Sequence, residues 1–334
     1  MQKKAFIHIG LAKTGTTSIQ HRLASNRAEL KQKQYCYPYV GVPEGSFGQH
    51  GLAWHLLSSR KLAQFCPHFR IDAFRREVQG AASKDLLVSS EELSSLSFSY
   101  PNVRSLLRLF PEHDVHVVAY VREQAAFFNS FYLEILSDFV DPGSFEDFVQ
   151  ARLLEKRYDY RHWFGIWDDL VGQRLLIRPF DKAILKDGDV VEDFKATVGL
   201  RAKLAAGEGA KQNVALNSYQ AAAMLHLIEE AKSRVDAADA PAAAKRKLKR
   251  AAAKIMLMPE LANGEPFWAF GPELLNRVKK HYDIANAEFF RAHGLPDFVF
   301  ESATAQPVTV IGFGDLDETT RKRVDQMWRE MTAA

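Results

Sequence analysis

The residues best suited to chemistry lie near the N-terminus, in a loop that carries a lysine, two glycines and several hydroxyl side chains. An apolar run, Phe6–Ile9, ends at Gly10, and the loop continues through Lys13 and Gly15 to Thr17. The run is typical of a buried strand, and a helical pattern begins at about Thr17. Backbone N–H groups at a helix start lack an intrahelical partner, and the helix dipole adds partial positive charge there. The pattern therefore predicts a site for a phosphate or a similar anion.

The position of the lysine separates this loop from the loop that binds ATP. The ATP-binding pattern is G-x-x-x-x-G-K-[ST], in which the lysine directly follows the second glycine. Gly10 and Gly15 keep that glycine spacing, but Thr16 follows Gly15, and the lysine stands at position 13. The Lys–Ser/Thr pair that serves a β/γ-phosphate and its Mg²⁺ is therefore missing from the sequence. The loop predicts phosphate binding and argues against ATP hydrolysis.

A second candidate anion site follows another apolar run. Val117–Val121 leads directly to Arg122, and Ser130 comes eight residues later in a helical pattern. Eight residues are about two helical turns, so the hydroxyl returns near the same side of the helix. A guanidinium with two donors and a hydroxyl with a third can bracket one phosphate.

These residues need a scaffold, and the apolar pattern predicts an α/β fold with a three-layer parallel sheet flanked by helices. Short apolar runs predict four strands, and helical patterns alternate with them. The expected strands are 5–9, 85–89, 115–121 and 174–177, and the expected helices are 17–33, 51–63, 71–79, 102–110, 123–137, 145–154, 160–170, 272–293 and 317–331. Ligands bind at the carboxyl ends of such strands, where Gly10, Glu91 and Arg122 all fall.

Length and composition limit the other possibilities. The chain has 334 residues, 47% hydrophobic content, a net charge of +3 and two cysteines. The charge is too small to predict nucleic-acid binding, and two cysteines make no disulfide framework. The N-terminal apolar run is too short for a signal peptide, and no segment predicts a membrane span, so we expect a cytoplasmic protein. We expect an α/β core in residues 1–200 and a helical elaboration in 201–334 that completes the same domain and contributes to the acceptor site.

The loop resembles the 5′-phosphosulfate loop of sulfotransferases that use 3′-phosphoadenosine 5′-phosphosulfate (PAPS). That family has a Lys-x-Gly-Thr-[ST] loop after a strand, matched here by Lys13-Thr14-Gly15-Thr16-Thr17, with Ser18 next to it. The Arg122–Ser130 spacing resembles the family's 3′-phosphate motif. The resemblance covers about residues 5–199, and bacterial and carbohydrate-type members are the most similar. The Arg-Lys-Gly-x-x-Gly segment of many animal cytosolic members is not found, so contacts from the C-terminal half stay unassigned.

The resemblance implies a sulfuryl transfer from PAPS to a hydroxyl or amine, with 3′-phosphoadenosine 5′-phosphate (PAP) as product. Backbone N–H groups of 14–18 would hold the 5′-phosphate, the hydroxyls of Thr17 or Ser18 would add hydrogen bonds, and Lys13 would lie near the bridging oxygen where charge develops. Arg122 and Ser130 would hold the 3′-phosphate. No metal is required, because the loop and Lys13 supply the compensating charge. A carbohydrate or glycolipid acceptor is expected from the resemblance alone, and the oligomeric state is not readable.

Three residues are candidates for the base that accepts the acceptor's proton. Glu91 follows the expected strand 85–89 and should face the same sheet edge as Lys13; carbohydrate-type members use a glutamate and cytosolic ones a histidine. His50 and His55 are the second and third alternatives. His50 lies on the long Gly- and Pro-rich connection 35–51, just before a helical run, and loops of that length are often functional. Glu91 could instead cap a helix, and His50 could be a solvated loop residue. A metal site built on His50 and His55 has no third ligand at a supporting spacing.

Two other readings of the chain remain open. A nucleotide or small-molecule kinase of the phosphate-loop superfamily would require ATP and Mg²⁺, against the position of Lys13. A non-catalytic PAPS- or nucleotide-binding module would keep the cofactor site without chemistry.

The basic run 245–250 could steer a polyanion, although a solvated helix face is the more common role of such a run. Phe267, Trp268 and Phe270 are expected in a core rather than against a sugar.

Overall fold

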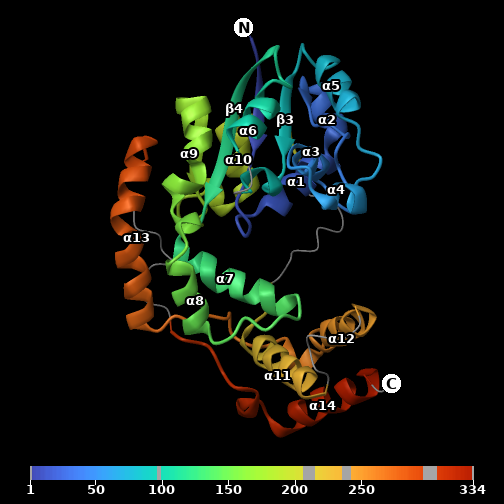
Figure 1. The fold of residues 1–334 in the computed structure, drawn as a ribbon, viewed down its shortest axis with the longest axis vertical. Helices are drawn as coiled ribbons and strands as arrows, with labels where there is room; N and C mark the ends of the chain where they lie inside the picture. The colour runs from blue at the N-terminus through green and yellow to red at the C-terminus, as the bar shows by residue number, and fades with distance from the viewer. Residues whose placement is uncertain (1, 96–98, 206–214, 235–241, 296–306, 333–334) are drawn as a thin grey trace. The chain divides into compact units, whose positions relative to one another are not determined.

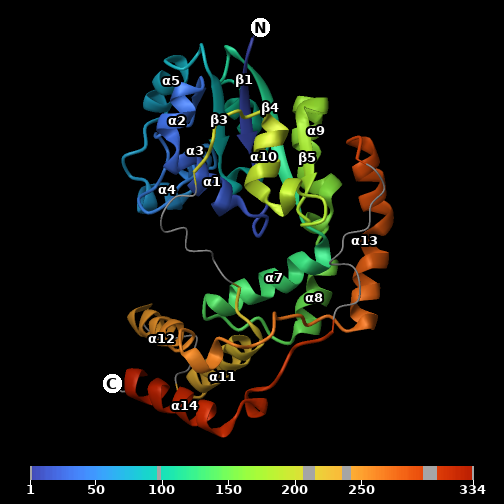
Figure 2. The same ribbon diagram turned by 180° about the vertical axis from the view of Figure 1, so that it is seen from behind.

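The computed structural model describes residues 2–95, 99–205, 215–234, 242–295 and 307–332 (Figures 1 and 2). The chain divides into two units that alternate along the sequence. The first unit comprises Met1–Glu123, Lys156–Gln212 and Tyr282–Glu301, and the second comprises Gln124–Glu155, Asn213–His281 and Ser302–Ala334. Residues 124–155, expected within the α/β core, therefore belong to the second unit.

The first unit is built on a parallel sheet of five strands. The strands lie in the order β2-β3-β1-β4-β5, and each neighbouring pair is parallel. Their bounds are β1 Lys3–His8, β2 Tyr35–Cys36, β3 Asp85–Ser89, β4 His113–Val121 and β5 Leu175–Pro179. The four expected strands are confirmed. The sequence did not predict β2, because a strand of two residues is too short to show an alternating pattern.

Helices cover both faces of this sheet, as Figures 1 and 2 show from opposite sides. On one face, Phe6 and Leu87 of the central strands pack into a core with side chains of helices α1, α2 and α10. The opposite face carries fully buried side chains such as Ile7, with α6 and α9 packed over it. The helices of the first unit before residue 200 are α1 Thr16–Ser25, α2 Arg27–Gln32, α3 His50–Leu56, α4 Arg60–Phe65, α5 Ile71–Gln79, α6 Tyr100–Leu107, α9 Tyr160–Val171 and α10 Val190–Val198. The expected three-layer α/β architecture is confirmed.

Two expected helices are each divided into two. The helix expected over 17–33 breaks at Asn26, whose side-chain amide donates to the carbonyl of Arg22 at 2.8 Å. Asparagine side chains compete in this way with the backbone bonds of a helix. The helix expected over 51–63 ends at Leu56, and Ser58 next to it has a positive φ of 51°. A new helix, α4, begins after this break, and the side chain of its N-cap Ser59 accepts a hydrogen bond from the N–H of Lys61.

The second unit is helical in its described residues, apart from an isolated antiparallel bridge between Asn217 and Pro266. Its core is aromatic: Phe267 and Phe270 are buried, and Phe267 stacks on Tyr132 at a ring distance of 6.0 Å. The remaining helices are α7 Gln124–Ser137, α8 Phe145–Leu153, α11 Ser218–Arg234, α12 Ala242–Ile255, α13 Pro272–Ala292 and α14 Glu318–Thr332, with residues 282–292 of α13 counted in the first unit. The expected core role of Phe267, Trp268 and Phe270 is confirmed, since all three are buried.

The basic run 245–250 was expected to form a solvated helix face, and its described residues do so. The side chains described from that run, Arg246, Lys247, Lys249 and Arg250, are exposed on α12. Across the described ranges, no helix combines the length and the apolar character needed to cross a membrane.

Candidate active site

The loop between β1 and α1 is closed by its own hydroxyl groups. The hydroxyls of Thr14 and Thr16 both donate to the carbonyl of Leu11, at 2.6 Å and 3.3 Å. Both threonines are buried, whereas Thr17 and Ser18 are exposed. Thr14 and Thr16 thus shape the loop with their side chains, and the hydroxyls that reach solvent are those of Thr17 and Ser18.

The start of α1 presents backbone donors that the helix itself does not use. Gly15 is the N-cap, and no side chain caps this end. The N–H of Ser18 donates to the carbonyl of Gly15 at 3.0 Å, so this N–H is engaged within the first turn. The N–H groups of Gly15, Thr16 and Thr17 come before the first N–H that has an acceptor inside the helix, so the helix does not use them. The N–H of Ser18 is thus engaged within α1, and anion binding by the N–H groups of the expected range 14–18 stays a prediction.

Two loop residues adopt left-handed backbone conformations. Lys13 has φ 63° and Gly15 has φ 75°. A Cβ at position 15 would lie 2.8 Å from Cγ1 of Val190 and 3.0 Å from Cε2 of Phe180. Glycine is therefore required at position 15 both by its φ and by the close approach of α10 and of the residue after β5.

Arg122 follows β4 and reaches the same loop. Its Nη1 donates to the backbone carbonyl of Lys13 at 3.2 Å, and its guanidinium lies 5.8 Å from the ring centre of Phe180. Burial lowers the pKa of Arg122, but an arginine stays protonated at neutral pH. The structure thus brings the expected Arg122 to the expected Lys13 loop. Ser130 lies on α7 in the second unit, and its pairing with Arg122 stays a prediction.

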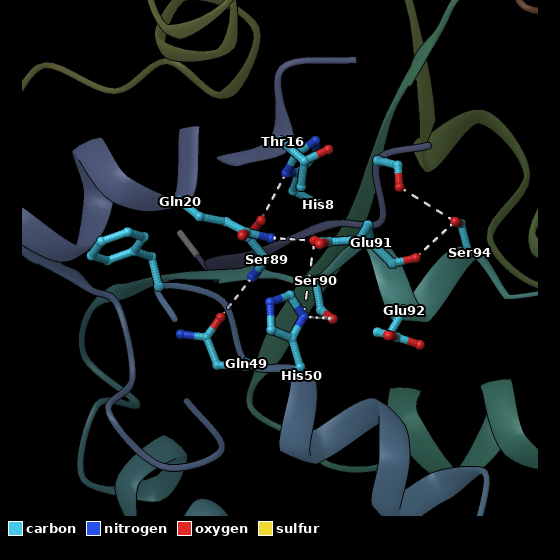
Figure 3. Close-up of polar contacts among 12 residues, drawn as sticks. His8, Thr16, Gln20, Gln49, His50, Ser89, Ser90, Glu91, Glu92 and Ser94 are labelled. Carbon is cyan, nitrogen blue, oxygen red and sulfur yellow. Dashed lines mark hydrogen bonds and ion pairs between the residues drawn. The ribbon is translucent and has the colours of Figure 1, made fainter. Parts of the chain in front are cut away.

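Glu91 and His50 meet at the carboxyl end of β3 (Figure 3). Glu91 begins the 3-10 helix Glu91–Ser94, and His50 is the first residue of α3. Oε2 of Glu91 lies 3.9 Å from Nδ1 of His50 and accepts from Nε2 of Gln20 at 2.8 Å. His50 is bonded through Nδ1 to Oγ of Ser90 at 2.8 Å. Two of the three expected bases therefore lie side by side, and Gln20 of α1 orients the carboxylate.

The turn that carries Glu91 also contacts the loop that carries Lys13. Oγ of Ser94 donates to the carbonyls of Glu91, at 2.8 Å, and of Gly10, at 3.3 Å. The carboxylate and the loop consequently belong to one hydrogen-bonded edge of the sheet. His55, the third expected base, lies elsewhere on α3, with its ring 5.4 Å from that of Phe69.

A buried polar layer lies beneath this edge. Nδ1 of His8 is bonded to Oγ of Ser89 at 2.8 Å, and Gln49 accepts from the N–H of Ser89 at 2.8 Å. Gln49 also donates to the carbonyl of Pro38 at 2.8 Å. The side chain of Gln49 thus links the connection 35–51 to β3 through Ser89. His8 is completely buried, and desolvation lowers its pKa to about 3. The imidazole is therefore neutral and has a structural role under the loop.

Sequence reasoning missed Gln20 and Gln49. Gln20 stands four residues after Thr16, one helical turn along α1, which was a usable signal for the same face. Gln49 precedes His50 in the connection 35–51, but its bond to the backbone of Ser89 has no sequence signal.

Within the described part of the chain, no three His, Cys, Asp or Glu side chains are grouped so that they could hold a metal ion. Cys36 and Cys66 are free thiols.

Comparison with known proteins gives a fold-level likeness. No protein-family model matches the sequence, and no curated protein matches it. A solved structure of a sulfotransferase from Alicyclobacillus acidocaldarius is similar, at 13% identity over 89% of this chain and 98% of that chain, with a TM-score of 0.44. A likeness at this level carries no argument about activity, which has to rest on the site itself.

Proposed function

We propose that this protein is a PAPS-dependent sulfotransferase that transfers a sulfuryl group to a hydroxyl or amine of a carbohydrate or glycolipid. The observation that carries the proposal is the hydrogen bond from Arg122 to the carbonyl of Lys13 at 3.2 Å. It joins two elements that are expected to bind anions and that lie 109 residues apart in sequence. An ATP-type loop would instead carry its lysine after Gly15.

The residues present fit a cofactor with several phosphates. Gly15, Thr16 and Thr17 offer backbone N–H groups at the positive end of α1. Lys13 and Arg122 supply two cations at the same loop, and neither requires a divalent metal to balance an anion. PAPS would supply an activated sulfuryl group, and the cradle, Lys13 and Arg122 would bind its phosphates.

Transfer would require a bond to form between sulfur and the acceptor oxygen or nitrogen while the bond from sulfur to the bridging phosphate oxygen breaks. The electron pair of the broken bond would leave with the phosphate. Lys13 would stabilise the negative charge on that phosphate oxygen, a contribution typical of preorganised cations and dipoles. The acceptor's proton goes to Glu91, whose carboxylate is held by Gln20 at 2.8 Å. His50, 3.9 Å from that carboxylate, is the alternative base.

The exposure of the two side chains supports Glu91 in this role. Its side chain is 37% exposed, against 11% for that of His50. A base must reach the acceptor hydroxyl within hydrogen-bond distance, and the more accessible carboxylate meets this requirement more easily. His50 would then help to orient the carboxylate and the acceptor.

Calorimetric titration with PAP, with ATP plus Mg²⁺ and with AMP tests the proposal. We expect micromolar PAP binding without added metal, and its loss in Arg122→Ala. Clear binding of ATP with Mg²⁺ and none of PAP would overturn the proposal in favour of a kinase. Tight PAP binding without transfer to any hydroxyl or amine acceptor would leave a non-catalytic binding module.

A further inference from the structure

A pocket opens beside His50 in the first unit. It has a volume of about 540 Å³ and is lined by residues of the connection 43–46, of α3 and of α4. His50 is among the lining residues of α3. The volume lies within the range of about 300–1,000 Å³ typical of small-molecule sites. A ligand in this pocket would contact His50, the alternative base, whose Nδ1 lies 3.9 Å from Oε2 of Glu91.

The pocket wall made by the connection is held in place by hydrogen bonds. The hydroxyl of Tyr37 donates to the carbonyl of Phe47 at 2.8 Å, and the N–H of Gly51 donates to the carbonyl of Gly41 at 2.8 Å. Gln49 fastens the same segment to Ser89. These bonds fix the chain on both sides of segment 43–46, which limits the conformations that this wall can adopt and lowers the entropy cost of binding.

The opposite wall is aromatic. The rings of Trp54 and Phe65 lie 5.9 Å apart, both side chains line the pocket, and Phe65 is 49% exposed. Around this wall stand the polar side chains of Glu44, Ser46 and Gln64. A ring with one apolar face and several hydroxyls fits both the aromatic and the polar side chains of the pocket. Its apolar face can pack on Phe65 while its hydroxyls form hydrogen bonds with the surrounding polar side chains.

The charge of the pocket argues against an anionic ligand. Its lysine, Lys61, is paired with Glu92 at 2.9 Å, and Glu44 adds a second carboxylate to the surroundings. A sulfated or carboxylated sugar would meet this negative charge without a free cation to offset it. A simple phenol would cover the aromatic wall, but its single hydroxyl is the reacting group, so the polar rim would stay unpaired.

We infer that this pocket binds the acceptor, that the acceptor is an uncharged sugar ring, and that Phe65 is a specificity-determining residue on which the ring packs. The inference rests on the proposed function, because His50 and Glu91 make the pocket an acceptor site only if transfer occurs there. It goes further in assigning the site and in excluding anionic sugars.

The test measures binding and transfer with a defined set of probes. Methyl glycosides of glucose, galactose and N-acetylglucosamine are titrated by NMR into the protein with and without excess PAP, beside 2-naphthol and a heparin disaccharide. Transfer to each probe is measured with labelled PAPS. The variants are Phe65→Ala, Phe65→Trp and, as matched control, Tyr100→Ala, an exposed aromatic on α6 outside the pocket.

We expect an uncharged glycoside to bind, and Phe65→Ala to weaken that binding about tenfold, as loss of an aromatic contact does. The KM for the glycoside should rise by a similar factor while kcat and the Kd for PAP stay unchanged. Phe65→Trp should retain binding, and Tyr100→Ala should leave it unaltered. Equal binding in Phe65→Ala, or preference for 2-naphthol or for the heparin disaccharide, would overturn the inference. Glycoside binding that depends on Phe65 in a protein without any PAP affinity would support the sugar pocket and overturn the proposed function.

Discussion

The guanidinium of Arg122 donates through Nη1 to the backbone carbonyl of Lys13 at 3.2 Å. Lys13 has a positive φ of 63°, a conformation that L-residues rarely adopt without support from their surroundings. The hydrogen bond supplies part of that support, since it fixes the carbonyl of Lys13. Arg122 therefore has two expected roles: it shapes the loop and carries charge for an anion.

Replacing Arg122 by alanine should weaken PAP binding strongly. A hydrogen bond to a charged group contributes about 1.5–3 kcal/mol, so we expect a rise in Kd of roughly ten- to a hundredfold. Calorimetric titration with PAP measures this. The control is Arg174→Ala, because Arg174 is exposed near the start of β5 and pairs with Asp114 at 3.3 Å. An equal loss of affinity in both variants would contradict a specific role for Arg122.

Replacing Lys13 by alanine should lower kcat strongly and change the Kd for PAP only slightly. The ammonium is expected to act mainly as charge develops on the leaving oxygen, so kcat should fall by about 10²–10³-fold, or 2.7–4 kcal/mol in the barrier. The Kd for PAP should change only a few-fold, because the backbone cradle remains. Single-turnover transfer and titration with PAP separate the two quantities. Small and equal effects of Lys13→Ala and Arg122→Ala would remove the division of roles.

Replacing Glu91 by glutamine should lower kcat by about 10²–10⁴-fold, the usual contribution of a general base. PAP affinity should stay within a few-fold of the original value. Glu112→Gln is the matched control, since Glu112 is exposed just before β4, at the opposite edge of the sheet. Retained activity in Glu91→Gln together with loss in His50→Gln would reassign the base to His50.

Gln20 should act through Glu91 rather than on the acceptor itself. Gln20→Leu removes the donor that holds Oε2 of Glu91 at 2.8 Å, so we expect kcat to fall about tenfold from misorientation of the carboxylate. Neither the KM for the acceptor nor the Kd for PAP should change. In the double variant with Glu91→Gln, the Gln20 substitution should have no further effect on kcat, and an additive loss would refute the positioning role.

The sequence predicted the sheet and the loop because their signals are local. Buried parallel strands read as short apolar runs, and the positions of Gly10, Lys13 and Gly15 mark a turn into a helix that needs no knowledge of distant residues. The same holds for Arg122, which directly ends an apolar run. For these elements, chain order and the parallel sheet suffice to bring the residues to one edge.

The remaining contacts depend on long-range packing that the sequence does not express. The bond from Gln49 to the backbone of Ser89 spans 40 residues, and that from Gln20 to Glu91 spans 71. Neither residue type is distinctive, and both act through a side-chain amide whose partner is set by tertiary structure. The pocket beside His50 could not be predicted either, because the sequence predicted one helix over 51–63, whereas Trp54 lies on α3 and Phe65 is the last residue of a separate helix, α4.

Replacing Gly15 by alanine should destabilise the first unit. A Cβ would lie 2.8 Å from Cγ1 of Val190, and φ 75° is unfavourable for alanine. We expect a loss of about 1–3 kcal/mol in the free energy of unfolding, measured in urea. Gly165→Ala is a matched control, because Gly165 lies within α9 and a methyl group there would meet no neighbouring atom within 4 Å beyond the backbone of its own helix. That substitution should stabilise the protein by roughly 0.5–1 kcal/mol, since alanine favours helix over glycine; a loss of equal size in both would contradict the clash.

Finally, the buried His8 should make stability depend on pH. Desolvation lowers its pKa from 6.5 to about 3 in the folded protein, so between these values the unfolded chain binds a proton that the folded protein excludes. The free energy of unfolding is thus unaffected by His8 well above pH 6.5 and decreases as the pH falls toward 3, by about 2 kcal/mol between pH 6.5 and 4.5. His8→Gln has no titrating ring and should lose correspondingly less over this range. Urea unfolding at pH 7.5, 6.5, 5.5 and 4.5 measures both slopes, and parallel curves for the two proteins would show that the imidazole is not the group responsible.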